Sequence, residues 1–239
     1  MTSKIRPIGS ASIAKKQINK KEQLYQDLKR KILTMKLAPG CDLEEVSISR
    51  EYDISRTPLR DIFRNLAGEG YVVIRNNRGA QVSPLNQKSF RDFLLVAPMI
   101  YGAISRLAAQ NARQEHIKQL KSIQRKFCSA LKDDNIEQKV FYNYQFHYQI
   151  GVMADNIYLG PSMGRLLIDH ARIAQTFYRA RDPETKKDLL KSCEHHDAMI
   201  EAFENHDERK AEKLAQEHWK LSRQSFERYV SPASLDIRL

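Results

Sequence analysis

The chain has few cysteines and no long apolar run, and each scarcity excludes a class of protein. Its three cysteines, Cys41, Cys128 and Cys193, are odd in number and far apart in a sequence of 239 residues. Without a CxxC spacing they predict neither a disulfide framework nor a cysteine zinc knuckle, and they fit a reducing, cytoplasmic location. No stretch approaches the roughly 20 apolar residues of a membrane span, and the basic N-terminus lacks the apolar run of a secretory signal. We therefore expect no membrane partner.

Positive charge is what the chain has in excess. The net charge is +11 and the isoelectric point is near 9.5, which suits a polyanionic partner but does not choose between DNA, RNA and a membrane surface. Residues 1–30 carry eight lysines and arginines against two acidic residues. We interpret residues 1–21 as a flexible basic arm, either a solvated tail or a segment that attracts phosphates.

Residues 44–82 have the pattern of a helix, a tight turn, a second helix and a short β-hairpin. Ser55 can cap the second helix, and Pro58 falls in its first turn, where a missing N–H costs little. Apolar residues occupy one face of this helix and arginines lie elsewhere: Leu59, Ile62, Phe63 and Leu66 against Arg56, Arg60 and Arg64. A helix with an apolar back and arginines near its N-terminus can lie in a DNA major groove.

The segment that follows has the composition of a wing. Gly68 and Gly70 are expected to end the helix, residues 71–74 form a strand, 75–79 a basic turn and 80–82 a second strand. The alternative is an ordinary helical core followed by a hairpin with a solvated basic tip. The immediate succession of turn, capped helix and basic hairpin favours DNA binding.

Residues 23–84 resemble the DNA-binding domain of the GntR family of bacterial transcription regulators. The resemblance rests on Leu24-Tyr25-(x)2-Leu28-(x)3-Ile32, Pro39-Gly40, Ser55-Arg56-Thr57-Pro58-Leu59-Arg60, Leu66-(x)3-Gly70 and Arg78-Gly79-(x)2-Val82. It implies that Ser55, Arg56, Thr57 and Arg60 contact the operator and that Asn76, Asn77 and Gly79 place the wing by the backbone. Independently of the resemblance, the positive charge of Arg78 in the wing should add salt-dependent attraction to phosphates. Val46 stands where the family usually has an arginine, and Arg50, one turn later, is the expected partial replacement.

After a linker at residues 85–89, helical periodicity continues almost without interruption to about residue 230, before a tail at 231–239. The expected helices are 89–111, 115–132, 136–153, 157–180, 184–205 and 207–229, and Pro98 should kink or split the first. Because the loops are short, neighbouring helices should pack antiparallel. The predicted fold is mainly α: a winged helix-turn-helix at 22–84 and an all-α antiparallel helical bundle at 90–230.

Three histidines fall on predicted inward faces of three different helices of this bundle. They are His147, His196 and His218, with Asn143 one turn before the first. Imidazole suits zinc and other transition metals, but a buried histidine is also an ordinary hydrogen-bonded core residue, and spacing alone leaves these interpretations even. His116 and His195 are interpreted as surface residues.

Residues 90–229 resemble the FCD effector domain of FadR-type GntR regulators. The matching segments are Leu107-Ala108-Ala109, Asn143-(x)2-Phe146-His147, Asn156-(x)2-Leu159, His196-(x)3-Ile200-Glu201-Ala202, and His218 after Ala211. In metal-binding members an aspartate and three histidines hold the ion, and small carboxylates complete its shell. The resemblance thus implies one divalent metal, zinc or similar, on Asn143, His147, His196 and His218, and an effector pocket that adds Tyr101. Asn143 replaces the aspartate and should weaken metal binding, while Pro98 and Tyr101 stand where an arginine and a glutamate are common.

The sequence therefore predicts a cytoplasmic, nucleoid-associated bacterial transcription regulator and not an enzyme. It would bind a short palindromic operator in double-stranded DNA as a homodimer and respond to a small organic acid. Repression is favoured and activation stays open. The rival hypotheses are a metal-dependent enzyme that uses the three histidines to activate water, and a non-specific nucleoid-binding protein.

Overall fold

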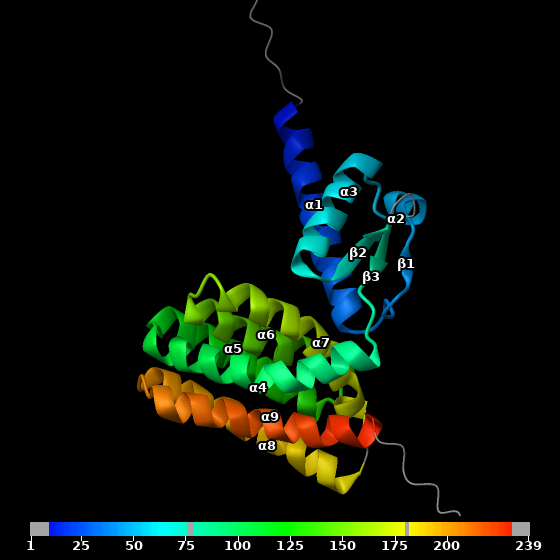
Figure 1. Cartoon of the computed structure of the whole chain (residues 1–239). Helices are drawn as coiled ribbons and strands as arrows, with labels where there is room; N and C mark the ends of the chain where they lie inside the picture. Colours follow the sequence, from blue (N-terminus) through cyan, green and yellow to red (C-terminus); the bar gives the residue numbers. More distant parts are fainter. Residues whose placement is uncertain (1–9, 76–78, 180–181, 231–239) are drawn as a thin grey trace, which may run out of the picture. The chain divides into compact units, whose positions relative to one another are not determined.

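The computed structural model of the chain describes residues 10–75, 79–179 and 182–230 (Figure 1). The chain divides into two compact units. The first contains the residues up to Pro84 apart from Leu33–Met35, and the second contains those three residues and everything from Leu85 onward. The fold is mainly helical, with one small antiparallel sheet in the first unit, which confirms the predicted fold class.

The first unit is a winged helix-turn-helix, and its described residues form three helices and three short strands. Its elements are α1 (Ser10–Leu33), β1 (Asp42–Leu43), α2 (Glu45–Glu51), α3 (Arg56–Glu69), β2 (Val72–Arg75) and β3 (Gly79–Val82). Strand β3 lies between β1 and β2 and is antiparallel to both, with Val72 opposite Val82 and Asp42 opposite Gln81. The sequence predicted the hairpin but missed β1, because two residues are too short to show a strand's alternation.

Two predicted boundaries in this unit are wrong. Helix α1 begins at Ser10, so the part of the predicted flexible arm from Ser10 onward is helical. Lysine, glutamine and alanine are good helix formers, and lengthening an existing helix needs no new nucleus. Helix α3 runs through Gly68 to Glu69 and ends at Gly70, whose φ of 90° is the left-handed conformation that glycine adopts without strain.

The core of the first unit forms where the apolar faces of α1 and α3 meet the sheet. The predicted stripes are buried as expected: Leu24, Leu28 and Ile32 on α1, and Leu59, Ile62, Phe63 and Leu66 on α3. Leu43, Val72, Ala80 and Val82 complete the core from the strands. Burial of one face of α3 leaves its opposite face, with the arginines, exposed to solvent.

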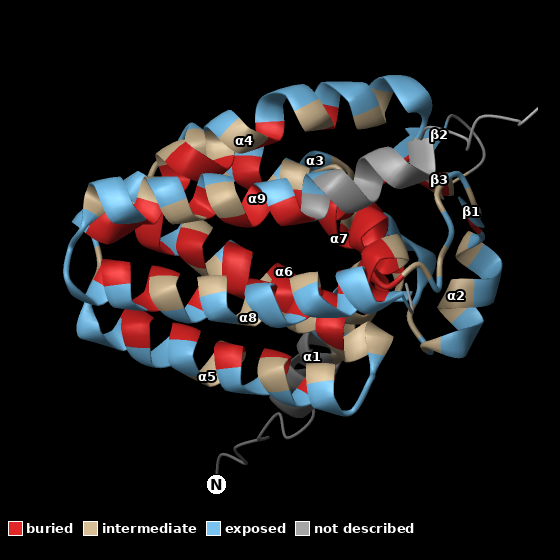
Figure 2. Cartoon of the chain, turned by 90° about the horizontal axis from the view of Figure 1, so that it is seen from below, coloured by how far each residue is buried: buried red, intermediate tan, exposed pale blue. Residues whose placement is uncertain are grey.

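The second unit is a bundle of long helices (Figure 1). They are α4 (Gln87–Gln110), α5 (Gln114–Lys132), α6 (Ile136–Ala154), α7 (Leu159–Arg179), α8 (Pro183–Glu204) and α9 (Glu208–Val230). Helix α4 packs against α9, α6 and α7, while α5 packs against α6 and α8. Buried residues alternate with exposed ones along most helices (Figure 2), as the apolar periodicity predicts.

Side-chain caps explain why several predicted boundaries agree with the structure within about two residues. Asn86 forms a capping box with Ser89 at the start of α4. The Asn135 side chain accepts a hydrogen bond from the backbone N–H of Gln138 at the start of α6, and the Asp182 side chain accepts one from the backbone N–H of Thr185 at the start of α8. Helix α4 continues unbroken across Pro98, so of the two predicted alternatives, a kink or a split, the split does not occur.

Among the described helices, α4 is also the one long and apolar enough to cross a membrane by length and composition, although the sequence showed no such stretch. That is weak evidence, because the core helix of a soluble protein passes the same test. Phe93, Ala97, Tyr101, Ile104 and Ala108 of α4 are buried against the bundle, so its apolar character is accounted for in part by the core.

The prediction that the cysteines form no disulfide is wrong for one pair. Cys128 of α5 and Cys193 of α8 are bonded, with their Cα atoms 6.5 Å apart, and Cys41 is free. The two positions are separated by 65 residues, and only the packing of α5 against α8 brings them together. Sequence spacing carries no signal for such a pairing.

Candidate DNA-binding surface and histidine centre

The exposed side of α2 and α3 carries the residues predicted to contact DNA. Arg50, Ser55, Arg56, Thr57 and Arg60 are all solvent-exposed. Ser55 occupies the N-cap position of α3, but its side chain makes no capping hydrogen bond, so the predicted cap is wrong. The first amide groups of α3 and the Ser55 hydroxyl thus face the same exposed turn, a position suited to a phosphate.

Arg60 is held by an ion pair at the edge of this surface. Its Nε lies 3.0 and 3.1 Å from the two carboxylate oxygens of Glu45 on α2. A groove of about 490 Å³ opens beside the pair, lined by Glu45, Arg60, Phe63, Arg64, Ile74, Arg75 and Gly79. Three arginines therefore border one open groove between α3 and the strands of the wing.

Gly79 is required by the geometry of the wing. Its φ is +75°, and a Cβ at this position would lie 3.2 Å from the carbonyl oxygen of Leu43 and 3.5 Å from Cγ of Glu45. Glycine thus allows β3 to approach β1 and α2 closely. Asn76, Asn77 and Arg78, predicted to place the wing and to attract phosphates, lie outside the described residues.

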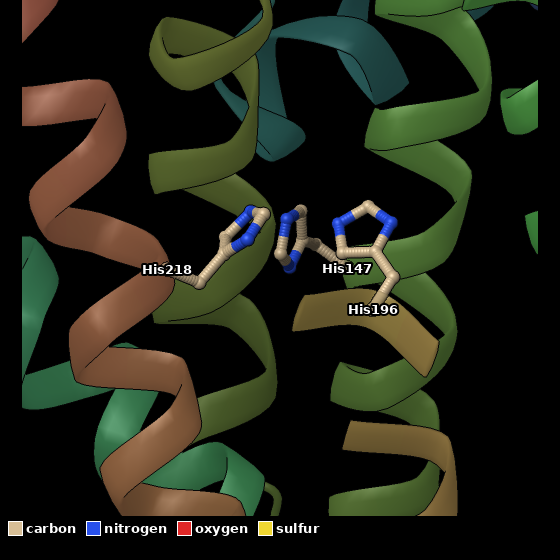
Figure 3. A group of neighbouring side chains, drawn as sticks. All are labelled: His147, His196 and His218. Carbon is tan, nitrogen blue, oxygen red and sulfur yellow. The ribbon is translucent and has the colours of Figure 1, made fainter. Parts of the chain in front are cut away.

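The three predicted histidines converge at the centre of the helical bundle. His147 comes from α6, His196 from α8 and His218 from α9, and Figure 3 shows their rings turned toward one another. One nitrogen from each ring lies within 4.8 Å of the others. The side chains are 2%, 0% and 5% exposed, so this histidine centre is almost fully withdrawn from water.

Three ring nitrogens of the histidine centre, and the amide oxygen of Asn143 one turn before His147 on α6, are buried without a hydrogen-bond partner among the described residues. They are Nε2 of His147, Nε2 of His196, Nδ1 of His218 and Oδ1 of Asn143. Leaving a buried polar group unpaired costs about 1–3 kcal/mol, so the four unpaired atoms on these residues together carry a high cost. Their chemistry, three imidazole nitrogens and an amide oxygen, fits a divalent cation such as zinc.

Gln124 of α5 fixes the orientation of one of these rings. Its Oε1 lies 3.0 Å from Nδ1 of His196, and its Nε2 donates to the Cys193 carbonyl at 2.9 Å and to Asp197 Oδ1 at 3.1 Å. Because Nε2 faces two acceptors, the amide oxygen must face the ring, and Nδ1 of His196 must carry the proton. Nε2 of His196 then keeps its lone pair, the form that binds a metal.

A fourth histidine, His170 of α7, lies beside the centre together with Tyr101. The Tyr101 hydroxyl is 2.5 Å from Nδ1 of His170, and the ring of Tyr101 stands edge-on to that of His147 with centroids 5.4 Å apart. Phe93 and Trp219 extend this aromatic wall. Tyr101, predicted from the sequence to line an effector pocket, thus adjoins the predicted ligands.

The sequence interpretation missed both Gln124 and His170. Each lies on a buried stripe of its helix: Gln124 between Leu120 and Phe127, and His170 between Leu167 and Ile173. A polar residue at a position where periodicity demands an apolar one was the available signal.

Burial keeps these histidines neutral. It lowers the pKa of His218 to about 3 and that of His170 to about 4, and it holds the pKa of His147 and His196 well below the usual 6.5. Neighbouring imidazoles add to the effect on His147, His196 and His218. Neutral imidazole is the form that coordinates a metal, so near pH 7 no proton has to be displaced.

The prediction that His116 is a surface residue is wrong, because its side chain is buried and its Nε2 lies 2.9 Å from an Arg113 nitrogen. His195 is partly buried, with its ring centroid 6.0 Å from that of His218. Neither belongs to the group of nitrogens that converge at the histidine centre.

Comparison with known proteins assigns both units. Residues 20–82 match the family described as bacterial regulatory proteins, gntR family, and residues 99–221 match the FCD domain. The HTH-type transcriptional repressor RspR of Escherichia coli is 28% identical over 134 residues, a segment that covers 56% of this chain and 59% of that relative's length. The galactonate operon transcriptional repressor of E. coli is 22% identical over 218 residues, which cover 83% of this chain and 93% of the relative.

The solved structure of E. coli McbR/YncC has the same fold, with a TM-score of 0.74 at 16% identity over 89% of this chain and 99% of that one. The matched families and named relatives are transcription regulators, in agreement with the prediction that the chain is not an enzyme. The chain belongs to the GntR family of bacterial regulators, with an FCD domain as its C-terminal part.

Proposed function

We propose that the chain is a transcriptional repressor that binds a short palindromic operator as a homodimer. A small carboxylate bound at the histidine centre, together with a divalent metal, controls its affinity for DNA. The observation that carries the regulatory part of this proposal is the convergence of His147, His196 and His218, which place ring nitrogens within 4.8 Å of one another and each of which has a buried ring nitrogen without a partner among the described residues. A purely structural core would leave these atoms unpaired at a high energetic cost.

The exposed surface of α3 supports operator recognition. Arg56 lies free of the core at the start of the helix, and Arg60 follows one turn later on the side of the groove. Arginine contacts guanine through two hydrogen bonds, each such pair being worth about 1–3 kcal/mol of discrimination. In the absence of DNA, Glu45 holds the Arg60 guanidinium in place. When DNA binds, Arg60 exchanges this ion pair for a contact with a base.

An apolar face of α4 supports the homodimer. Leu95 and Met99, one turn apart, are 73% and 72% exposed, and Val96 beside them is 41% exposed. These positions are the part of this apolar helix that the bundle core does not use. A second copy that packs on this face would bury them and would hold two recognition helices at a fixed separation.

The histidine centre supports control by a metal and a carboxylate. His147, His196, His218 and Asn143 would hold the ion, which when bound supplies a positive charge and open coordination positions for an anionic effector. Tyr101 and His170 form the wall beside it. An effector that favours one arrangement of the dimer changes operator affinity through linkage.

The DNA-binding part is tested by selecting preferred sequences from genomic fragments and then measuring competition with random DNA. Arg56→Ala should remove the sequence preference and retain salt-dependent binding. The matched control is Arg64→Ala, which removes the same charge two turns further along α3 and should weaken binding to all sequences alike. An unchanged preference in Arg56→Ala would contradict the assignment, and the absence of any preferred sequence would favour a non-specific nucleoid protein.

The metal part is tested by elemental analysis of tag-free protein purified without chelator. We expect about one transition-metal ion per chain and a zinc-dependent rise in melting temperature that is absent in His196→Ala but kept in the control His206→Ala, at an exposed position. If the purified protein contains no metal and added zinc does not raise its melting temperature, the assignment of a metal site is contradicted and the histidines line a metal-free pocket.

A further inference from the structure

The disulfide lies one helical turn from the residue that orients the histidine centre. On α5, Gln124 and Cys128 are four residues apart and therefore share a face. On α8, Cys193 precedes His196 by three residues and Asp197 by four, so all three occupy neighbouring positions on one side of the helix. The same α5–α8 contact thus carries both the sulfur bridge and the hydrogen bond to His196.

Gln124 touches both ends of this arrangement. Nε2 of Gln124 lies 2.9 Å from the carbonyl oxygen of Cys193 and 3.3 Å from the Sγ atom of Cys193. Oε1 of Gln124 lies 3.0 Å from Nδ1 of His196. The side chain is only 4% exposed. A change in the spacing of α5 and α8 at the sulfurs must therefore alter the position of the amide that orients His196.

Solvent exposure and the redox state of the cytoplasm bear on the role of this disulfide. Cys128 and Cys193 are both partly exposed to solvent, so a small thiol can reach them. A regulator that binds DNA works in the bacterial cytoplasm, where disulfides are rare and those present are mostly catalytic or redox-sensing. A purely structural role for this bond fits that compartment poorly.

We propose that the Cys128–Cys193 bond sets the metal affinity of the histidine centre through Gln124, so that reduction weakens metal and effector binding. This inference rests on the metal site proposed above. Gln124 is a positioning residue: it holds the His196 ring through Nδ1 and leaves the lone pair of Nε2 available for a metal. Loss of such an outer partner typically lowers metal affinity by about 10- to 100-fold.

The redox step is an ordinary thiol–disulfide exchange. A cellular dithiol attacks one sulfur, and the bridge accepts two electrons and two protons to become two thiols while the dithiol becomes a disulfide. The reverse step uses a disulfide or hydrogen peroxide as oxidant, and peroxide is converted to two molecules of water. The covalent link between α5 and α8 exists only in the oxidised form.

The test measures zinc affinity of the full chain by competition with a chromophoric chelator. The oxidised protein is compared with protein reduced by a phosphine, which is removed under anaerobic conditions before titration. Cys128→Ser with Cys193→Ser removes the bridge without creating thiols that could bind zinc. Gln124→Met keeps the length of the side chain and removes the acceptor for His196. The control is Gln149→Met on α6, since Nε2 of Gln149 has no partner among the described residues.

We expect the reduced protein and the double serine variant to bind zinc about tenfold more weakly than the oxidised protein, the lower end of the range for an outer partner. Gln124→Met should be at least as weak, and reduction should change it no further. Bound cobalt should give the same absorption band in all forms, because the ligands themselves are unchanged. Gln149→Met should match the oxidised wild type, and melting temperatures without metal establish that each variant is folded.

Equal affinities of the oxidised protein and the double serine variant would overturn the coupling while leaving the metal site intact. An equal effect of reduction on wild type and Gln124→Met would overturn the role of Gln124. If no form takes up zinc, the metal assignment fails and the coupling fails with it, an outcome distinct from the other two.

Discussion

The buried histidines make the stability of the bundle depend on pH, and His170 allows the effect to be worked out for one residue. Its pKa falls from 6.5 in the unfolded chain to about 4 in the folded protein because burial disfavours the charged ring. Between these two values the unfolded state binds a proton that the folded state does not. Stability from this residue is therefore complete above pH 6.5 and is lost as the pH falls toward 4.

The size of the loss in free energy of unfolding follows from the difference between the pH and the unfolded-state pKa of His170. At pH 5 the unfolded ring lies about 1.5 pH units below its pKa while the folded ring is still mostly neutral, a cost of about 2 kcal/mol. In metal-free protein, the other histidines of the centre act in the same direction, so the total loss is larger. His170→Gln keeps an acceptor for the Tyr101 hydroxyl and removes the titrating group.

The assay is urea unfolding of metal-free protein at pH 7.5 and pH 5. From pH 7.5 to pH 5, the free energy of unfolding of the wild type should fall by about 2 kcal/mol more than that of His170→Gln. Tyr101→Phe removes the Tyr101–His170 contact but keeps the buried, titrating ring, so it serves as the control and should keep the wild-type fall. Equal falls in wild type and His170→Gln would refute the reasoning that His170 is buried in its neutral form.

Three further predictions concern the wing, the dimer and the metal. Gly79→Ala should lower the free energy of unfolding by about 1–2 kcal/mol, because the φ of Gly79 is +75° and the new Cβ meets the Leu43 carbonyl. The control Gly68→Ala should not lower it, because a Cβ at this position in α3 has no atom within 4 Å. Leu95→Glu with Met99→Glu should yield monomers in light scattering, whereas Leu190→Glu on α8, also an exposed leucine, should leave the dimer intact. Asn143→Asp should raise zinc affinity in the chelator competition, and an unchanged affinity would exclude this position as a ligand.

The sequence predicts the helices well because local physics sets them. The apolar stripe of α3, the caps at Asn86 and Asp182 and the short loops all act within a few residues, so α4 to α9 lie where periodicity places them. Strand β1 and the start of α1 were missed for a local reason as well: neither has an apolar pattern long enough to recognise.

The candidate site was predictable only in part, because it depends on packing between distant helices. His147, His196 and His218 were placed on inward faces by periodicity, and the structure brings them together. The partners that orient them were missed. Gln124 and His170 interrupt apolar stripes, and their roles appear only when α5 meets α8 and α7 meets α4. The disulfide depends on the same α5–α8 contact, which no spacing in the sequence records.

The charge of the histidine centre bears on which effector it can hold. Three neutral imidazoles and the Asn143 amide supply no negative charge, whereas the family resemblance places an aspartate at that position. A divalent ion bound there keeps its full positive charge in a buried environment, where an uncompensated charge is costly. A carboxylate effector supplies the missing compensation, so metal and effector should bind cooperatively, each raising the affinity for the other by the same factor. At the proposed metal site, the replacement of the aspartate would make metal binding more dependent on the effector, and a doubly charged carboxylate would compensate the ion better than a singly charged one.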